Sequence, residues 1–296
     1  MQFGKVNDPS KIDFSLPADT KETSDILKKN KADKEFEAFV GCAKWNKADL
    51  KGFYPKGTKD ELTYYATQFN SIELNATFYK SPDRAQVITW KDKTPADFKF
   101  FPKIVNTVSH FRRLINVKEP LTEYCDAISN FEEKLGMVFL QLHDNFKPKD
   151  FDRLKTLVEE FPKVIPLAIE LRNEEWFTDE NMSQKVFELF KENGVANIIV
   201  DTAGRRDMLH MKLTSPTAFI RYVGANHDSD YKRLDEWVER IEKWKSEGLQ
   251  HLYFFVHQNV EKASPLLSAH FIKKLNKTVG TNLKIPQLAS NAPELF

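Results

Sequence analysis

Short apolar runs recur along this chain of 296 residues, and several of them end in charged or amide side chains. In the run 71–78, Ile72 and Leu74 alternate with Glu73 and Asn75. Because neighbouring side chains of a strand point to opposite faces, the two apolar residues share one face and the two polar residues share the other. Several strands that deliver polar groups at the same end predict a lined pocket.

Eight runs of strand-like composition alternate with charged, amphipathic stretches of helix-like composition. The expected strands are 38–42, 71–77, 98–103, 137–142, 166–171, 196–201, 218–223 and 251–257. The expected helices include 59–69, 120–134, 149–161, 181–193, 234–247 and 263–276. This alternation predicts an α/β fold, a single (β/α)8 TIM-type barrel. A doubly wound open sheet is the main alternative, but the turn 41–45 after the first strand is no GxGxxG fingerprint.

Residues 1–35 are polar and rich in Lys and Asp, so we expect an N-terminal extension outside a barrel domain of residues 36–296. One apolar island in the extension, 12–17, is expected to pack on the barrel surface. Within the barrel domain, three glycines stand where helices are expected to stop. They are Gly136, Gly194 and Gly248.

Composition narrows the class of partner. Lys and Arg number 44 against 43 Asp and Glu, a net charge of +1, which argues against a dedicated nucleic-acid coat or a binder of anionic membranes. Two cysteines make no disulfide framework, and the N-terminus has no apolar signal segment. No window approaches the roughly 20 apolar residues that a membrane span needs. We therefore expect a cytoplasmic protein with no membrane partner, and nucleic acid stays a less favoured partner.

In a barrel of this kind the carboxyl ends of the strands carry the chemistry, so the polar faces are expected to meet at one mouth. Glu73 and Glu170 are the candidate acid and base, because they come from well separated strands and would flank a bound molecule. Lys103 is the third candidate catalytic group, and it would form a Schiff base if neighbouring cations lowered its pKa. The candidate substrate-binding residues are Asn75, His110, Gln141, Arg172, Asp201, Arg221 and His257.

Arginine forks suit carboxylate or phosphate oxygens, so a small anionic molecule is the expected ligand. The plain alternative is a salt-bridge layer, such as Glu73–Arg221 or Glu170–Arg172, that only plugs the barrel. The histidines and acids are also metal-donor types, but no tight spacing such as HExxH accompanies them. We predict no cofactor and leave a divalent metal as the less favoured alternative.

One stretch of the sequence is especially specific. Ile72-Glu73-Leu74-Asn75-Ala76-Thr77-Phe78-Tyr79 resembles the V-E-x-N-x-T-F-Y motif of the YecE-like family, domain of unknown function 72. Gly41-Cys42-Ala43-Lys44-Trp45 is similar to its G-T-S-G-W, and Lys51-Gly52-Phe53-Tyr54-Pro55 to its G-x-F-Y-P. Further matches follow in order at 94–103, 109–110, 134–142, 170–176 and 220–224.

The resemblance covers residues from about 37 to 276. It implies a barrel fold in a soluble microbial protein, and it supplies no reaction. The chain departs from the family pattern at His143, Asn173 and Val223, and at the end of the last strand, 253–259. These departures imply a variant rim, which makes His143 and His257 weaker candidates than Glu73 or Glu170.

Three functions remain as hypotheses. The first is an enzyme (a hydrolase, lyase or isomerase) that uses acid/base chemistry on a small anionic or polyhydroxylated metabolite. The second is a metal-dependent phosphodiester hydrolase or nuclease. The third is a non-catalytic protein that binds the same kind of anion.

Overall fold

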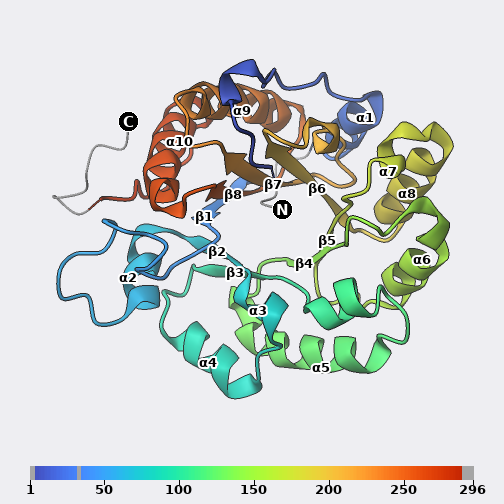
Figure 1. Ribbon diagram of the computed structural model, residues 1–296, viewed down its shortest axis with the longest axis horizontal. Coiled ribbons are helices and arrows are strands. Elements are labelled where there is room, and N and C mark those ends of the chain that lie inside the picture. Colours follow the sequence, from blue (N-terminus) through green and yellow to red (C-terminus); the bar gives the residue numbers. More distant parts are fainter. Residues whose placement is uncertain (1–3, 32–34, 289–296) are drawn as a thin grey trace.

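The computed structural model describes residues 4–31 and 35–288. Parallel strands occupy its middle and helices surround them (Figure 1). The strands are β1 (Glu37–Cys42), β2 (Ser71–Leu74), β3 (Lys99–Pro102), β4 (Val138–Gln141), β5 (Leu167–Glu170), β6 (Ala196–Thr202), β7 (Thr217–Gly224) and β8 (His251–Gln258). Each overlaps the run predicted for it. β2, however, is shorter than expected, because Asn75 already has helical backbone angles and precedes a helical turn.

Helices follow most strands. The α-helices are α1 (Lys21–Lys29), α2 (Glu61–Gln68), α3 (Ala76–Tyr79), α4 (Arg84–Asp92), α5 (Lys118–Ile128), α6 (Phe151–Glu160), α7 (Glu175–Thr178), α8 (Glu180–Glu192), α9 (Ser229–Glu247) and α10 (Ser264–Val279). Short helices of other types are η1 (Pro9–Lys11), η2 (Thr107–Phe111), η3 (Ser129–Lys134), η4 (Pro148–Asp150), η5 (Arg206–Met208) and η6 (Glu261–Ala263). Among these helices, none is long and apolar enough to cross a lipid bilayer, so far as the described residues go.

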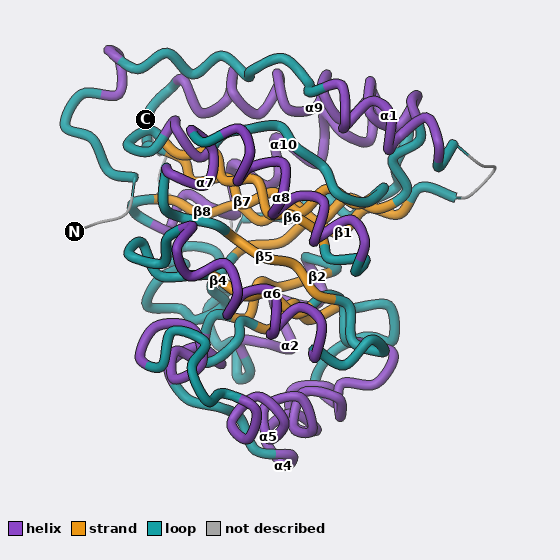
Figure 2. The backbone as a smooth tube through the Cα atoms, turned by 90° about the vertical axis from the view of Figure 1, so that its right-hand side faces the viewer, coloured by secondary structure: helices purple, strands orange, loops and turns teal. Residues whose placement is uncertain are grey.

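The strands do not close into a barrel, so the prediction of a (β/α)8 TIM-type barrel is wrong. Six strands form one open parallel sheet in the order β1-β8-β7-β6-β5-β4, and β2 pairs with β3 in a separate two-stranded sheet. Figure 2 shows the helices on either side of these strands, with α1 and α9 on one side and α4 and α5 on the other.

Side chains occupy the gap between β1 and β2, where backbone hydrogen bonds would have to close a barrel. The Asn70 amide donates to the carbonyl of Ala38 (2.9 Å). The Tyr65 hydroxyl lies between the strands, accepting from the Cys42 N–H (2.7 Å) and donating to the carbonyl of Ser71 (3.0 Å). Because side chains satisfy these buried backbone groups, the two strands have no need to pair with each other.

The other break lies between β3 and β4, which share isolated bridges instead of a ladder. The Gly136 N–H donates to the carbonyl of Phe100 (2.8 Å), and the Ile104 N–H donates to that of Phe139 (2.9 Å). A Cβ at Gly136 would lie 2.7 Å from the Phe101 ring. Gly136 follows the end of η3 as predicted, but it is required by close packing and lacks the positive φ of the other two predicted glycines, which follow α8 and α9.

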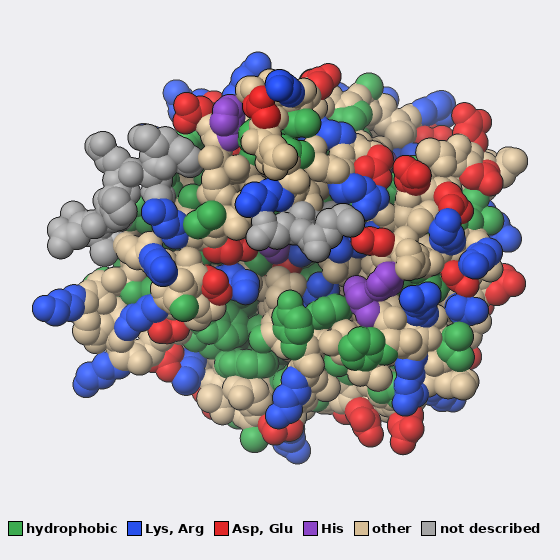
Figure 3. All heavy atoms as spheres, viewed as in Figure 1, with side chains coloured by type: hydrophobic (Ala, Val, Ile, Leu, Met, Phe, Trp, Pro, Cys, Tyr) green, Lys and Arg blue, Asp and Glu red, His purple; other side chains and the backbone are tan. Residues whose placement is uncertain are grey.

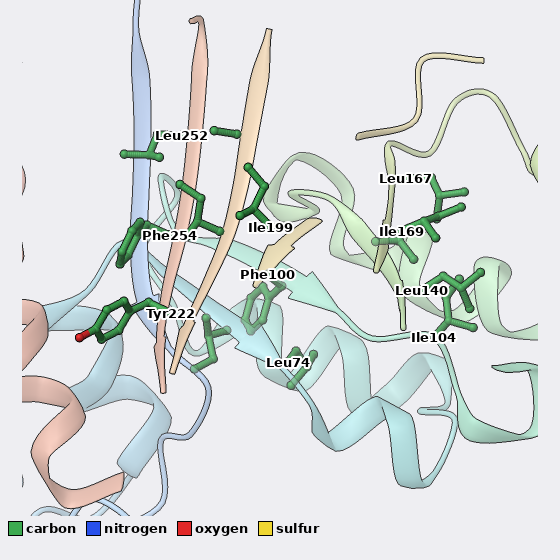
Figure 4. Close-up of a cluster of buried hydrophobic side chains, with 14 of the residues drawn as sticks. Leu74, Phe100, Ile104, Leu140, Leu167, Ile169, Ile199, Tyr222, Leu252 and Phe254 are labelled. Atoms are coloured by element: carbon green, nitrogen blue, oxygen red, sulfur yellow. The ribbon is translucent and has the colours of Figure 1, made fainter. Parts of the chain in front are cut away.

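Apolar side chains fill both faces of the strands. One cluster lies between the strands and the helices (Figure 4). A second cluster lies on the inner face, where the Phe101 ring contacts Phe219 (centroids 5.9 Å apart) and Phe255 (4.9 Å). This aromatic layer fills the space below the carboxyl ends of the strands, so the polar groups on that face lie above it.

The N-terminal extension packs against α9. Asp19 accepts hydrogen bonds from Arg240 (2.7 Å) and Trp244 (3.0 Å), and the Phe14 ring lies 4.3 Å from the Arg233 guanidinium. The apolar island thus packs on the surface as expected. α1 was not predicted, because its sequence is mostly charged. It begins at the N-cap Thr20, whose hydroxyl accepts a backbone hydrogen bond from the first turn. The domain boundary at residues 35 and 36 stays a prediction.

Candidate functional site

Arg221 on β7 lies at the centre of a buried polar cluster at the carboxyl ends of the strands. Its Nε and Nη2 donate to the two oxygens of Glu73 (2.9 and 2.7 Å), and its Nη1 donates to Glu170 (2.5 Å). Both carboxylates are fully buried. β7 is extended, so Arg221 projects to the same face as Phe219 in the inner aromatic layer. The guanidinium therefore fixes two acids from β2 and β5 above that layer.

Gln141, at the end of β4, connects Lys103 to one of these acids, Glu170. The Lys103 ammonium donates to the Gln141 oxygen (2.8 Å), and the Gln141 amide donates to Glu170 (3.0 Å). Arg172 donates through Nε to the same Glu170 oxygen (2.6 Å). Glu170 therefore accepts two hydrogen bonds at one oxygen and one at the other, all from side chains of the protein.

Glu73 has its own further partners. The Asn75 amide donates to it (2.7 Å), and the His257 Nε2 lies 2.9 Å from its other oxygen. The other ring nitrogen of His257 lies 3.9 Å from Glu261, whose pKa burial raises. Glu261 was not predicted as a site residue, because a spacing of four residues brings side chains together on a helix and His257 lies on a strand. We call the residues around Arg221 the Arg221 cluster: Glu73, Asn75, Lys103, Gln141, Glu170, Arg172, Arg221 and His257.

The charges of this cluster decide which groups can transfer a proton. Burial alone would raise the pKa of Glu170, but Arg221 and Arg172 outweigh it and lower the pKa to about 2. Burial likewise opposes ionisation of Glu73, yet Arg221 and His257 hold its pKa well below the ordinary value. Both acids are thus ionised at neutral pH and are poor proton donors.

The pKa of Lys103 lies near neutrality. Burial, and then the charge of Arg221, lower its pKa to about 7. Its ammonium lies 4.0 Å from the centre of the Phe78 ring and donates to Gln141. No carboxylate of the described residues lies within 4.0 Å of it. The candidate role of acid and base therefore passes from the two glutamates to this amine.

His110 lies beyond Phe78, on the same side of the cluster as Lys103. Its ring packs edge-on against Phe78 (centroids 4.9 Å apart) and His143 (5.2 Å), and its Nδ1 lies 2.9 Å from the Ser109 hydroxyl. Burial and the nearby Lys103 lower the pKa of His110 to about 4, so the ring is neutral at pH 7. His110 belongs to the π-helix η2, a type of turn that is frequent at functional sites.

Asp201 is the predicted site residue that the structure places elsewhere. Its carboxylate accepts hydrogen bonds from Arg233 (2.8 Å) and Trp237 (2.8 Å) on α9, and from Arg206. Its neighbour Val200 points into the inner aromatic layer instead. The placement of Asp201 at the mouth is therefore corrected. All of β6 is buried, and a strand buried on both faces gives no clear alternation from which to assign them.

The side chains of the Arg221 cluster that could bind a metal ion instead bind other groups of the protein. Its carboxylates bind guanidinium, imidazole and amide groups of the chain. In residues 4–31 and 35–288, no group of three or more His, Cys, Asp or Glu side chains is arranged to hold a metal ion. The cysteines are buried, and burial raises the pKa of the Cys125 thiol to about 12.

Aromatic side chains are prominent on the surface near the strand ends. Tyr79 of α3 and Phe111 of η2 are each 76% exposed. On the face of the molecule shown in Figure 3, hydrophobic side chains gather near the centre, beside histidine and basic side chains. The residues that sequence analysis grouped at one mouth are thus together, except for Asp201, and whether they contact a substrate stays a prediction.

Comparison with known proteins places these residues within a shared fold. The family described as "Protein of unknown function DUF72" matches residues 39–291. The UPF0759 protein YecE of Escherichia coli (strain K12) is 25% identical over 277 residues, which cover 85% of this chain and 98% of that protein. The UPF0759 protein YunF of Bacillus subtilis (strain 168) is 27% identical over 150 residues, which cover 47% of this chain and 52% of that protein.

Solved structures of DUF72 family proteins share this fold. A DUF72 family protein of Enterococcus faecalis V583 superposes with a TM-score of 0.66 at 18% identity, covering 84% of this chain and all of that chain. Another, from Thermotoga maritima MSB8, gives 0.63 at 25% identity, covering 81% of this chain and 99% of that chain. These similarities support a curled α/β fold with an open sheet.

Proposed function

This chain belongs to the DUF72 family of proteins of unknown function, and we propose that its Arg221 cluster binds a small anionic molecule, with Lys103 as the group that releases and takes up a proton. The surroundings of Lys103 carry this proposal. Glu73 and Glu170 bind Arg221 and Arg172, whereas Lys103 lacks a carboxylate within 4.0 Å in the described chain. Lys103 is only 7% exposed, so its charge is not balanced by bulk water.

A buried amine of this kind has two low-energy states. Without a ligand it loses its proton and becomes a neutral base. With an anion beside it, it stays an ammonium ion that binds the anion directly. Binding of an anion at neutral pH therefore takes up a proton at the Lys103 Nζ, and departure of the anion returns it. A bound molecule with an acidic C–H or O–H next to its anionic group would be a substrate for general base catalysis.

The two glutamates have a supporting role in this proposal. Each is ionised and held by at least two donors, so neither is available for proton transfer. Glu170 instead orients Gln141, and Gln141 fixes the position of the Lys103 ammonium. Glu73 and Glu170 are positioning residues, and the reaction class, whether hydrolase, lyase or isomerase, depends on the molecule that binds.

A salt-bridge layer that only plugs the strands would contain some of the same contacts, since the pairs Glu73–Arg221 and Glu170–Arg172 are both present. Lys103 would not take part in such a layer, because no carboxylate of the described residues lies within 4.0 Å of it. A second buried lysine of the molecule shows what a structural lysine looks like. The Lys134 ammonium, also on a residue 7% exposed, donates to the carbonyls of Lys91 and Thr94 (both 2.7 Å) and to the Thr94 hydroxyl (3.3 Å). Lys103 has one such acceptor.

Ligand-induced thermal stabilisation of the full chain tests the proposal. Inorganic phosphate, sugar phosphates and small carboxylates should raise the Tm of the wild-type protein and of Lys134→Met, relative to each protein without ligand. Lys103→Met should show no rise. Calorimetry in buffers of different ionisation enthalpy should detect uptake of a proton with the anion at about pH 8, above the Lys103 pKa. If no anion raised the Tm, or if Lys103→Met responded as the wild type does, the site would not bind anions through Lys103.

Activity on the ligand that binds separates an enzyme from a binding protein. Turnover that is lost in Lys103→Arg, with binding kept, would place proton transfer at Lys103, because an arginine keeps the charge and does not act as a base at neutral pH. Binding without turnover in the wild-type protein would favour the binding protein.

A further inference from the structure

A cavity of about 690 Å³ lies between α1 and α8, and none of the residues that line it belongs to the Arg221 cluster. We propose that this cavity binds a small carboxylate with an apolar or aromatic body. Its volume is within the range of roughly 300–1,000 Å³ that small-molecule sites occupy. The proposal does not depend on the function of the Arg221 cluster.

α1 lies outside the residues that the DUF72 family model matches. It covers residues Lys21–Lys29, whereas the DUF72 match begins at residue 39. Figure 1 shows α1 beside α7 and α8, at the edge of the molecule. The cavity therefore exists in this chain because the N-terminal extension supplies one of its walls.

Hydrogen bonds fix the position of α1, which forms one wall of the cavity. Thr23 of α1 is fully buried. Its hydroxyl donates to the carbonyl of Met211 (3.0 Å) and accepts from the N–H of Leu213 (2.9 Å). These two bonds join α1 to the segment that leads into β7, so the cavity is formed before a ligand arrives and little conformational entropy is lost on binding.

Apolar and aromatic groups make up much of the lining. Ile26 of α1, Leu213, Phe177 of α7 and Phe187 of α8 all line the cavity. Behind the two phenylalanines, His210 stacks on Phe177 (centroids 4.8 Å apart). Burial lowers the pKa of His210 to about 3, so its ring is neutral and adds to the aromatic surface without adding charge. An apolar or aromatic body of a ligand would be removed from water here.

The ammonium of Lys212 lies against this apolar surface. The Lys212 ammonium donates to the hydroxyl of Ser183 (2.9 Å) and lies 4.8 Å from the centre of the Phe187 ring. Ser183 is 2% exposed. Among the residues that the structure describes, no carboxylate lies within 4.0 Å of the Lys212 ammonium. A ligand carboxylate next to Lys212 and Ser183 would complete the set of charge-assisted hydrogen bonds.

The other charges of the lining select against more highly charged anions. Glu22 and Glu180 act electrostatically on Lys212 and line the cavity with it. Asp25 and Glu188 also line it, but they are paired with Lys21 (2.8 Å) and Lys191 (3.2 Å). Lys29 lines the cavity as well, and the two acids would repel a ligand with two negative charges, such as phosphate, more strongly than a ligand with one. The ligand class is therefore a monocarboxylate.

Phenylacetate is the probe, and saturation-transfer NMR with a titration of the full chain is the measurement. We expect saturable binding to the wild-type protein and a loss of affinity of about tenfold or more in Lys212→Met, since a buried charge-assisted contact is removed. Lys191→Gln is the matched control, because Lys191 lines the same cavity but is paired with Glu188. Its affinity should stay within about twofold of the wild type. Phenethylamine and inorganic phosphate should not compete.

Lys103→Met separates this cavity from the Arg221 cluster. Phenylacetate should bind Lys103→Met as it binds the wild-type protein. Ser183→Ala, which removes the second donor, provides an independent variant should Lys212→Met fold poorly, and it should weaken binding several-fold. Equal binding to the wild type, Lys212→Met and Ser183→Ala would overturn the proposal, as would displacement by phenethylamine or a loss of binding in Lys103→Met.

Discussion

Arg221 and Arg233 are both buried, and each binds two carboxylates. Arg221 lies between Glu73 and Glu170 at the strand ends. Arg233 lies behind β6 and β7, and it donates to Asp201 (2.8 Å) and Asp230 (3.0 Å). What differs is the set of charges around each pair.

Around Arg233 the charges match and the groups are enclosed by the fold. Asp201 and Asp230 face Arg233, and Arg206 supplies a second guanidinium. Burial opposes ionisation of Asp201, but these cations keep its pKa lowered. Phe14 of the extension covers the Arg233 guanidinium. Such an arrangement holds α9 and the extension on the sheet.

Around Arg221 the same motif carries a third cation, Lys103, whose own carboxylate is missing from the described residues. An arginine between two buried acids therefore does not by itself mark a functional site. A buried cation beside it that has no carboxylate partner does mark such a site, because this cation must lose its proton or acquire a ligand.

The largest expected effect is on stability. Arg233→Met leaves Asp201 and Asp230 buried without their guanidinium, so the free energy of unfolding should fall by about 3–5 kcal/mol. Urea denaturation of the full chain measures this. Anion binding by the protein that remains folded should be unchanged. A loss of anion binding in folded Arg233→Met would show that the two arginine clusters are not separate in function.

Acid should weaken both clusters. The folded-state pKa of Glu170 is about 2, below its ordinary value of 4.5, so the stability that it contributes is present above about pH 4.5 and is lost as the pH falls toward 2. Compared with the wild type, Glu170→Gln should be less stable by about 3 kcal/mol at pH 7, with the difference shrinking as the pH falls. Denaturation between about pH 7 and pH 2.5 measures it.

Asp201→Asn, in the cluster around Arg233, should likewise make the free energy of unfolding less dependent on pH in acid. If stability became less dependent on pH in Asp201→Asn but not in Glu170→Gln, Glu170 would not be held ionised by its arginines.

Two buried lysines give a matched test of smaller size. Lys134→Met should lose about 2 kcal/mol at every pH, since it removes a charged donor with three acceptors. For Lys103 the folded-state pKa, about 7, lies below the ordinary value of 10.5, so the unfolded state binds the extra proton between these two values. Wild-type stability should therefore rise with pH above about 7, relative to Lys103→Met.

At about pH 6 we expect Lys103→Met to be as stable as the wild type or more stable, by up to about 2 kcal/mol. Denaturation curves at several pH values measure both lysine variants. If Lys103→Met behaved like Lys134→Met at all pH values, Lys103 would be a structural lysine.

The smallest expected effect concerns Phe14, whose ring lies against the Arg233 guanidinium. Phe14→Ala should reduce the free energy of unfolding by about 1 kcal/mol, the usual size of a half-buried cation–π contact. Urea denaturation measures it, with Phe111→Ala as an exposed aromatic control that should change stability little. A larger effect in Phe111→Ala would mean that this surface ring is covered by something else in solution.

Local sequence determined much of this molecule. The composition of eight short runs predicted all eight strands within a few residues, and the polar ends of those strands predicted that Glu73, Glu170, Lys103 and Arg221 lie together. The reason is that side-chain direction along a strand depends only on position within the strand. The order of strands and helices likewise followed from composition over short windows.

Tertiary structure decided the rest. The sheet is open because Tyr65 and Asn70, from outside the strands, occupy the backbone groups of β1. Asp201 faces α9 because Arg233 and Trp237 lie there, thirty and more residues further along the chain. The lowered pKa of Lys103 likewise depends on groups from several other strands. Strand direction is a local property, whereas pairing, burial and charge depend on distant parts of the chain that meet only in the folded state.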